Sequence, residues 1–253
     1  MNHTAIVSHF ANYAKSMSYL ATSPDLAHIP YALTETGPAL VAPLAFNGAF
    51  AAALWMVDFH LYAMARGVRR VHAQQRPIET KSLWAPVPVP GTNKAPQVRA
   101  PFYAQMFVAD FVGRSGCEEL EVVELECQDE DVTGYVMYED GRAVRVALVN
   151  LRAWSRSDGA ARGARTVDLS VPQGLRSAAV RKLSADAGVE ALGFDVGGAA
   201  QNVTWAGEQW AYAVDGGSGH RVGPASTALD VRDGTVSVKV ADSEAVLVDV
   251  ECS

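Results

Sequence analysis

The feature of this sequence that most constrains its fold is a change in the pattern of apolar residues near residue 115. Before that point helical and strand patterns alternate, and after it come many short strand patterns separated by turns that contain Gly and Asp. The first pattern is typical of parallel βα units, and the second is typical of an antiparallel sandwich. We therefore expect an α/β part over residues 1–115 and an all-β part over residues 116–253.

The α/β part has apolar residues at helical spacing in three places and two short apolar runs between them. The expected elements are a helix from Ile6 to Leu20, a strand from His28 to Thr34, a helix from Phe46 to Met64, a strand from Val68 to Gln74 and a helix from Phe102 to Phe111. A proline-rich loop separates the last two. Two parallel strands cannot close a barrel of eight, so this part is either a small α/β layer or the last portion of a longer barrel.

The all-β part is expected to form a sandwich from short strands. The runs that predict them begin at Leu120 and Val132 and then cover Val144 to Val149, Thr166 to Val171, Ala179 to Leu183, Val203 to Trp205, Trp210 to Val214, Val236 to Val240 and Ala245 to Val250. Turn signals such as Asp140-Gly141 and Asp233-Gly234 lie between several of them.

Charge and composition exclude some classes of partner. A net charge of −7 and a pI near 5.4 argue against a nucleic-acid surface. No apolar stretch reaches the ~18 residues that suggest a membrane span. The first residues also lack the charged start and apolar core of a signal peptide. The three cysteines, Cys117, Cys127 and Cys252, allow one disulfide and a free thiol, or three buried thiols.

Glu35 is the strongest candidate for a catalytic residue. It follows a short apolar run and precedes Gly37 and Pro38, which break the chain before the next helix. Catalytic residues of barrel enzymes project from the C-terminal ends of strands, and a carboxylate there can act as nucleophile, general base or metal ligand. A solvated loop carboxylate is the alternative. The scattered histidines and cysteines have no metal-ligand spacing, so neither a metal nor another cofactor is expected.

Several segments resemble the closing part of glycoside hydrolase family 79, the β-glucuronidase and heparanase-like family. They are Thr34 to Gly37, Phe50 to Phe59 and Gly67 to Gln75 in the α/β part, with Gly134-Tyr135, Leu148 to Asn150 and Val203 to Gly207 in the all-β part. The resemblance implies the last two strands of a (β/α)8 barrel followed by an antiparallel β-sandwich. It also implies a secreted hydrolase that acts on a glycan with β-linked uronic acid.

The resemblance places Glu35 at the end of the seventh barrel strand, on the retaining nucleophile. Gly37 departs from the polar residue that often follows the Glu-Thr pair. The family's acid/base glutamate follows an Asn, and this chain has no Asn-Glu pair. Because a retaining mechanism needs two carboxyl groups ~5–5.5 Å apart, we expect this chain alone to be inactive or very weakly active. A non-catalytic carbohydrate-binding or accessory protein is the alternative.

His72, Gln74 and Trp84 are the candidate substrate-binding residues. The resemblance implies that His72 and Gln74 face the substrate at the end of the eighth strand, where the Gln74 amide can hydrogen-bond sugar hydroxyls. Trp84 can stack on a sugar ring or anchor its loop against the core. Asp58 is expected to pair with an Arg or cap a loop. Asn202 begins an Asn-Val-Thr sequon, which carries an N-glycan only if the chain is secreted.

Overall fold

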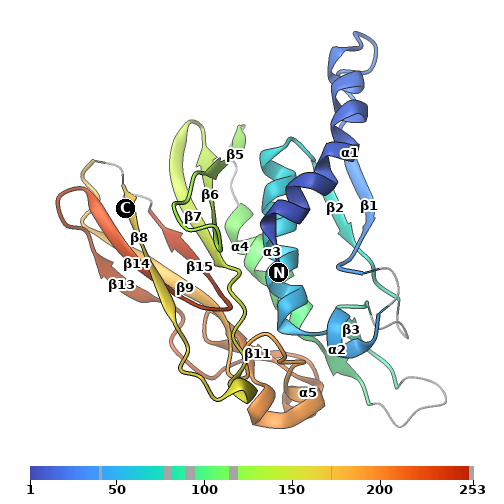
Figure 1. Ribbon diagram of the computed structural model, residues 1–253, viewed down its shortest axis with the longest axis vertical. Helices are drawn as coiled ribbons and strands as arrows, with labels where there is room; N and C mark the ends of the chain where they lie inside the picture. The colour runs from blue at the N-terminus through green and yellow to red at the C-terminus, as the bar shows by residue number, and fades with distance from the viewer. Residues whose placement is uncertain (40–41, 77–80, 89–94, 114–118, 172, 251–253) are drawn as a thin grey trace.

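The structure is a computed structural model that describes residues 1–39, 42–76, 81–88, 95–113, 119–171 and 173–250. Three layers follow one another across the molecule (Figure 1): a small parallel sheet with its helices, a large antiparallel sheet and a small antiparallel sheet. Within the described residues, no helix is both long and apolar enough to cross a membrane. The α/β part followed by an antiparallel sandwich confirms the predicted fold class.

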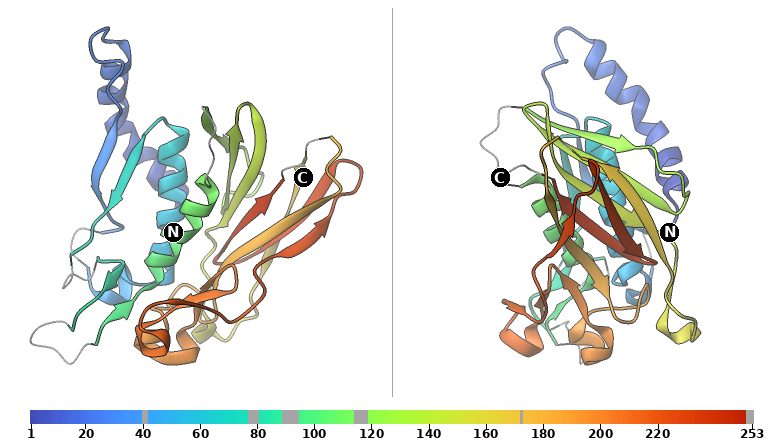
Figure 2. Two further views of the ribbon diagram at one scale, coloured as in Figure 1. Left: turned by 180° about the vertical axis from the view of Figure 1, so that it is seen from behind. Right: turned by 90° about the vertical axis from the view of Figure 1, so that its left-hand side faces the viewer.

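The parallel sheet and its helices follow the predicted order. They are α1 (His3–Thr22), β1 (Ala32–Thr36), α3 (Phe50–Ala65) and β2 (Arg70–Ala73). β1 and β2 pair in parallel, with Leu33 opposite Val71. α1 buries only Ile6 and Phe10, and its second half projects from the rest of the molecule (Figure 2).

The predicted start of the first strand was wrong. Residues after α1 form turns, in which Ala27 donates to Ser23 at 2.9 Å and Ile29 donates to Leu26 at 2.8 Å. These hydrogen bonds occupy the backbone groups that a strand would need for its ladder. The strand consequently begins at Ala32, and Glu35 lies inside it, one residue before its end.

The long helix predicted from Phe46 to Met64 is divided. A break at Gly48 separates α2 (Leu44–Asn47) from α3. Phe46 belongs to α2 and its side chain is 54% exposed, so its assignment to the apolar stripe was wrong. α3 itself is buried on nearly every side, which explains why its apolar residues form more than a single stripe.

The start of α3 depends on a distant loop. The Phe50 N–H donates to the Ala191 carbonyl at 2.8 Å, and the Ala51 N–H donates to the Val189 carbonyl at 3.0 Å. α3 has no side-chain N-cap, so these carbonyls satisfy two donors that the helix leaves free. The α/β part and the sandwich are therefore joined by main-chain hydrogen bonds as well as by packing.

The proline-rich stretch contains a short hairpin. β3 (Trp84–Ala85) pairs antiparallel with β4 (Gln97–Val98), and α4 (Ala100–Val112) follows directly. Pro101 lies in the first turn of α4, where its fixed φ and missing N–H suit the start of a helix. The helix predicted to begin at Phe102 thus begins two residues earlier.

The large sheet has the strand order β12-β11-β10-β9-β15-β7-β6-β5, and β13 also pairs with β9. The bounds are β5 (Leu120–Leu125), β6 (Val132–Glu139), β7 (Arg142–Asn150), β9 (Ser177–Ala185), β10 (Val203–Trp205), β11 (Glu208–Trp210), β12 (Gly219–Arg221), β13 (Thr227–Asp230) and β15 (Glu244–Asp249). Its described pairings are antiparallel, as the sequence predicted.

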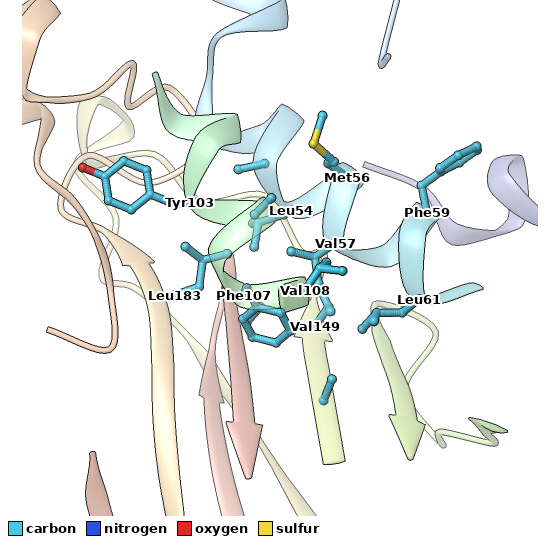
Figure 3. Packing of buried hydrophobic residues seen from close by; sticks show 14 of the residues in the cluster. Leu54, Met56, Val57, Phe59, Leu61, Tyr103, Phe107, Val108, Val149 and Leu183 are labelled. Carbon is cyan, nitrogen blue, oxygen red and sulfur yellow. The ribbon is translucent and has the colours of Figure 1, made fainter. Parts of the chain in front are cut away.

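Both faces of this sheet are covered. One face packs on α3 and α4, as Figure 3 shows for Leu54, Phe107, Val149 and Leu183. The other face packs on β8 (Ala164–Ser170) and β14 (Thr235–Ala241), which form the second sheet of the sandwich. Central strands such as β15 therefore carry unbroken apolar runs, because neither face needs polar residues.

The predicted strand from Trp210 to Val214 was wrong beyond its first residue. β11 ends at Trp210, and α6 (Tyr212–Asp215) follows. The Asp195 carboxylate of α5 (Phe194–Gly197) accepts hydrogen bonds from the backbone N–H groups of Tyr212 and Ala213. A carboxylate at the start of a helical turn stabilises that turn.

The predicted domain boundary between residues 115 and 116 lies outside the described residues and stays a prediction. Cys117 and Cys252 lie outside them as well. Cys127 is a half-buried free thiol. Its burial, with the nearby carboxylates Glu124 and Asp129, raises the pKa of the thiol.

Candidate active site

Glu35 lies at an irregularity near the C-terminal end of β1. The pairing with β2 shifts between Leu33 and Thr36, so two residues of β1, Thr34 and Glu35, lie opposite His72 alone. Such a bulge bends its strand and re-aims a side chain. Thr34, Glu35 and His72 are all exposed, whereas Leu33, just before the bulge, is buried.

A shallow depression of about 300 Å³ lies next to Glu35. Its walls come from α1, the end of β1 and α3, and its lining residues are Ala5, Ile6, His9, Tyr13, Glu35, Thr36, Gly37, Pro38, Trp55 and Phe59. Glu35 is the one carboxylate among these lining residues, and within the described part of the chain its side chain accepts no hydrogen bond. The group is therefore open to a ligand that enters the depression.

His9 and Tyr13 line this depression and were not predicted as site residues. They are one helical turn apart on α1, and the His9 Nε2 lies 2.9 Å from the Tyr13 hydroxyl. The sequence signal that could have identified them is their spacing of four residues, which brings two side chains together on a helix.

His72 and Gln74 lie at the same end of the parallel sheet as Glu35. The Thr36 hydroxyl donates to the His72 carbonyl at 3.0 Å, and the Gln74 N–H donates to the Thr36 carbonyl at 3.0 Å. Neighbouring strands are about 4.8 Å apart, so these hydrogen bonds hold His72 beside the bulge that carries Glu35. Neither His72 nor Gln74 lines the depression itself.

Trp84 lies apart from Glu35, in an aromatic cluster. The Gln75 side chain donates to the Trp84 carbonyl at 2.8 Å and accepts from the Leu83 N–H at 2.9 Å, which fixes the loop after β2. The Trp84 ring meets Phe102 edge to face at 5.7 Å, and Phe102 meets Trp210 of the sandwich at 5.8 Å. The contacts of Trp84 are those of a loop anchor, the alternative weighed for it.

The described residues that line the depression include no carboxylate other than Glu35. Retaining glycosidases hold two carboxyl groups ~5–5.5 Å apart, one as nucleophile and one as acid/base. No described group of three or more His, Cys, Asp or Glu side chains could hold a metal ion. The arrangement offers an exposed carboxylate with a neighbouring imidazole and amide, which is one half of such a site.

Residues 134–247, within the sandwich, match the glycosyl hydrolase family 79 C-terminal beta domain. The chain is also similar to two fungal enzymes named β-glucuronidase. It is 33% identical to one from Aspergillus niger over 154 residues, which are 60% of this chain and 27% of that enzyme. It is 30% identical to one from Neurospora crassa over 119 residues, which are 43% of this chain and 21% of that enzyme.

Solved structures of glycoside hydrolases share the fold. A 4-O-α-L-rhamnosyl-β-D-glucuronidase from Fusarium oxysporum, solved with a Rha-GlcA ligand, superposes on 98% of this chain with a TM-score of 0.76 at 20% identity. A family 51 arabinofuranosidase from Xanthomonas axonopodis superposes on 98% with a TM-score of 0.62 at 14% identity. The chain spans 49% and 46% of those two proteins, about half of each.

Proposed function

We propose that this chain, which matches the family 79 C-terminal beta domain over residues 134–247 and is similar to two β-glucuronidases, supplies half of the active site of a retaining β-glucuronidase-like enzyme. Glu35 is the nucleophile of that half-site. The observation that carries the proposal is the exposed Glu35 carboxylate at the C-terminal end of a parallel strand. That end of the strands is where barrel enzymes place their catalytic groups.

The chemistry assigned to Glu35 is attack on the anomeric carbon of a β-linked glucuronic acid residue. A covalent glycosyl-enzyme forms as the bond to the leaving oxygen breaks, and water then hydrolyses it. A second carboxyl group must protonate the leaving oxygen and later deprotonate the water. The residues lining the depression include no candidate for that role, so the second group has to come from another polypeptide segment.

His72 and Gln74 are proposed to bind sugar hydroxyls beside Glu35. Support comes from their place at the same strand ends and from the hydrogen bonds that their backbone groups make there with Thr36. Trp84 is proposed instead to anchor the loop after β2, with its ring packed against Phe102. The glycan partner is also a proposal, suggested by the substrates in the names of the relatives. The extracellular location is a proposal that rests on the family resemblance alone.

Asn202 is proposed as an N-glycan acceptor in a secreted form of the protein. It caps the short helix η2 (Gly198–Gln201), is half-buried, and its side-chain oxygen accepts a hydrogen bond from Gln209. Secretion from a eukaryotic host, followed by enzymatic glycan removal, should lower the mass of the protein, and Asn202→Gln should abolish that shift. An unglycosylated Asn202 in the secreted protein would refute the assignment.

The experiment that tests the half-site measures hydrolysis and binding together. We expect the purified chain to release no detectable phenol from an aryl β-glucuronide, and calorimetry to detect weak glucuronate binding. Gln74→Ala should weaken that binding several-fold, because one buried or half-buried hydrogen bond is worth about 0.5–1.5 kcal/mol. The exposed Gln173→Ala should leave it unchanged.

Robust turnover by the purified chain would contradict the half-site proposal. Saturable sugar binding with no reactivity at Glu35 would favour the alternative, a non-catalytic carbohydrate-binding protein. The observation that favours this non-catalytic function is that Glu35 is the one carboxylate among the residues that line the depression.

A further inference from the structure

His3 joins α1 to two other elements through both of its ring nitrogens. Its Nδ1 lies 3.0 Å from the Asp58 Oδ2 of α3, and its Nε2 lies 3.0 Å from the Glu124 Oε1 of β5. The Asp58 side chain is fully buried, and those of His3 and Glu124 are 17% and 25% exposed. One imidazole therefore connects the first turn of α1 to the central helix and to the edge of the large sheet.

Only the protonated ring satisfies this geometry. A neutral imidazole has one N–H and one lone pair, whereas the imidazolium donates from both nitrogens. With a carboxylate oxygen facing each nitrogen, loss of the proton would set a lone pair of the ring against a carboxylate. The hydrogen bond to Asp58 raises the pKa of His3 above its ordinary value of 6.5, against the opposing effect of burial.

The groups around this contact are fixed in turn. The Tyr135 hydroxyl of β6 donates to Asp58 at 2.6 Å, and burial raises the pKa of that phenol so that it stays a donor. Arg66 pairs with Oε2 of Glu124, the carboxylate oxygen that does not face His3. Tyr62 of α3 meets the His3 ring edge to face at 5.4 Å. Apart from His3 itself, α1 has no charged side chain among these contacts.

α1 has little else to hold it in place. Its buried residues are Ile6 and Phe10, and Phe10 packs on Phe59 and Tyr62 at 5.2 and 5.1 Å. The first turn of α1 contains no acidic residue, so Asp58 and Glu124 also supply the negative charge that the positive end of a helix favours. The ionic contact thus acts where the helix is weakly packed.

We propose that His3, Asp58 and Glu124 form a proton-dependent latch that fixes α1 against α3 and the large sheet. Protonated His3 holds the helix in the observed position, and loss of the proton releases its first turns. Since Ala5, Ile6 and His9 form one wall of the depression beside Glu35, release of α1 removes that wall. The proposal concerns the position of α1 and does not depend on the role proposed for Glu35.

The sign of the pH dependence follows from linkage. A histidine whose pKa is higher in the docked state stabilises that state fully below 6.5 and loses the effect as pH rises through the raised pKa. Each unit by which the pKa exceeds 6.5 corresponds to a factor of about ten in the docking equilibrium. The helix is therefore docked in acid and released in alkali.

Two measurements test the latch in the intact chain. An NMR titration of the His3 ring, assigned through its contact with the Tyr62 ring, should give a pKa above 6.5 that falls in Glu124→Gln. Hydrogen exchange of the α1 amides, corrected for intrinsic rates, should show protection that falls at least several-fold from pH 6 to pH 9. In His3→Gln the protection should be low at both values, and the exposed His28→Gln should behave as the parent.

A His3 pKa at or below 6.5 would overturn the proposal, even if His3→Gln failed to fold. Equal corrected protection of α1 at pH 6 and pH 9 would overturn it too. So would an unchanged pH dependence in His3→Gln. None of these results bears on whether Glu35 reacts with a sugar, so the two proposals fail or stand separately.

Discussion

Two histidines of the α/β part have pKa shifts of opposite sign, because their surroundings differ. His3 faces two carboxylates that favour its charged form, and its pKa is raised. His60 of α3 is buried without any charged partner among the described residues, and desolvation lowers its pKa to about 4. Its Nε2 has no hydrogen-bond partner there, while its Nδ1 lies 3.4 Å from the Gln105 amide. Burial without a charged partner disfavours the protonated, charged form of the ring.

His60→Leu should stabilise the protein, and more so in acid. Between pH 6.5 and 4 the unfolded chain binds a proton at this ring that the folded chain does not, so His60 lowers stability as pH falls. The penalty reaches about 2 kcal/mol at pH 5, and removing an unsatisfied buried group adds about 1 kcal/mol at any pH. Urea unfolding at pH 7 and pH 5 measures both terms. A difference between variant and parent that is equal at the two pH values would contradict the shift.

The end of α4 is fixed by one arginine from the sandwich. The Arg145 Nε donates to the Phe111 carbonyl at 2.8 Å and its Nη2 donates to the Val112 carbonyl at 3.1 Å, while Glu139 pairs with the same guanidinium. The last carbonyls of a helix lack internal partners and carry partial negative charge, so a cation there stabilises the helix. Arg145 thereby joins α4 to β7.

Arg145→Met should lower the free energy of unfolding by about 2–3 kcal/mol, because hydrogen bonds from a charged donor contribute more than neutral ones and two carbonyls lose their partner. The exposed Arg176→Met is the matched control and should change stability by less than about 0.5 kcal/mol. Urea midpoints at neutral pH decide the comparison. Equal midpoints for the two variants would show that Arg145 does not hold α4.

The sequence predicted elements whose causes are local. The run from Val144 to Val149 forms β7, and β1 and β2 pair in parallel as expected. The sequence-based predictions were wrong where groups distant in the sequence determine the backbone conformation. Nothing near Phe50 signals that α3 begins on the carbonyls of Ala191 and Val189, and nothing near Tyr212 signals the carboxylate of Asp195.

The candidate site follows the same division. Glu35 stands out from its local pattern and lies at a strand end, whereas the bulge that places it opposite His72 depends on the register between two strands. Asp58 was expected to pair with an Arg or cap a loop, and it binds His3 and Tyr135 instead. Sequence spacing cannot predict these two contacts, because His3 is 55 positions from Asp58 and Tyr135 is 77 positions from it.

At the scale of the whole molecule, the large sheet shares one core with α3 and α4 and a second core with β8 and β14. The parallel sheet, among the described residues, has two strands. A parallel sheet is usually buried on both faces, and here Thr34, Glu35 and His72 are exposed. The proposed half-site accounts for this exposure. A barrel active site is formed by the ends of several strands, so two strands alone leave their catalytic residues uncovered.

The most direct test of the account is covalent trapping at Glu35. A 2-deoxy-2-fluoro-β-glucuronosyl fluoride carries a leaving group that departs without a general acid, so a nucleophile alone can form the glycosyl-enzyme. Mass spectrometry of the intact chain and its peptides should find one fluoroglucuronosyl group on Glu35, absent in Glu35→Gln and retained in the exposed Glu119→Gln. No adduct, or one that persists in Glu35→Gln, would contradict the assignment of Glu35 as the nucleophile.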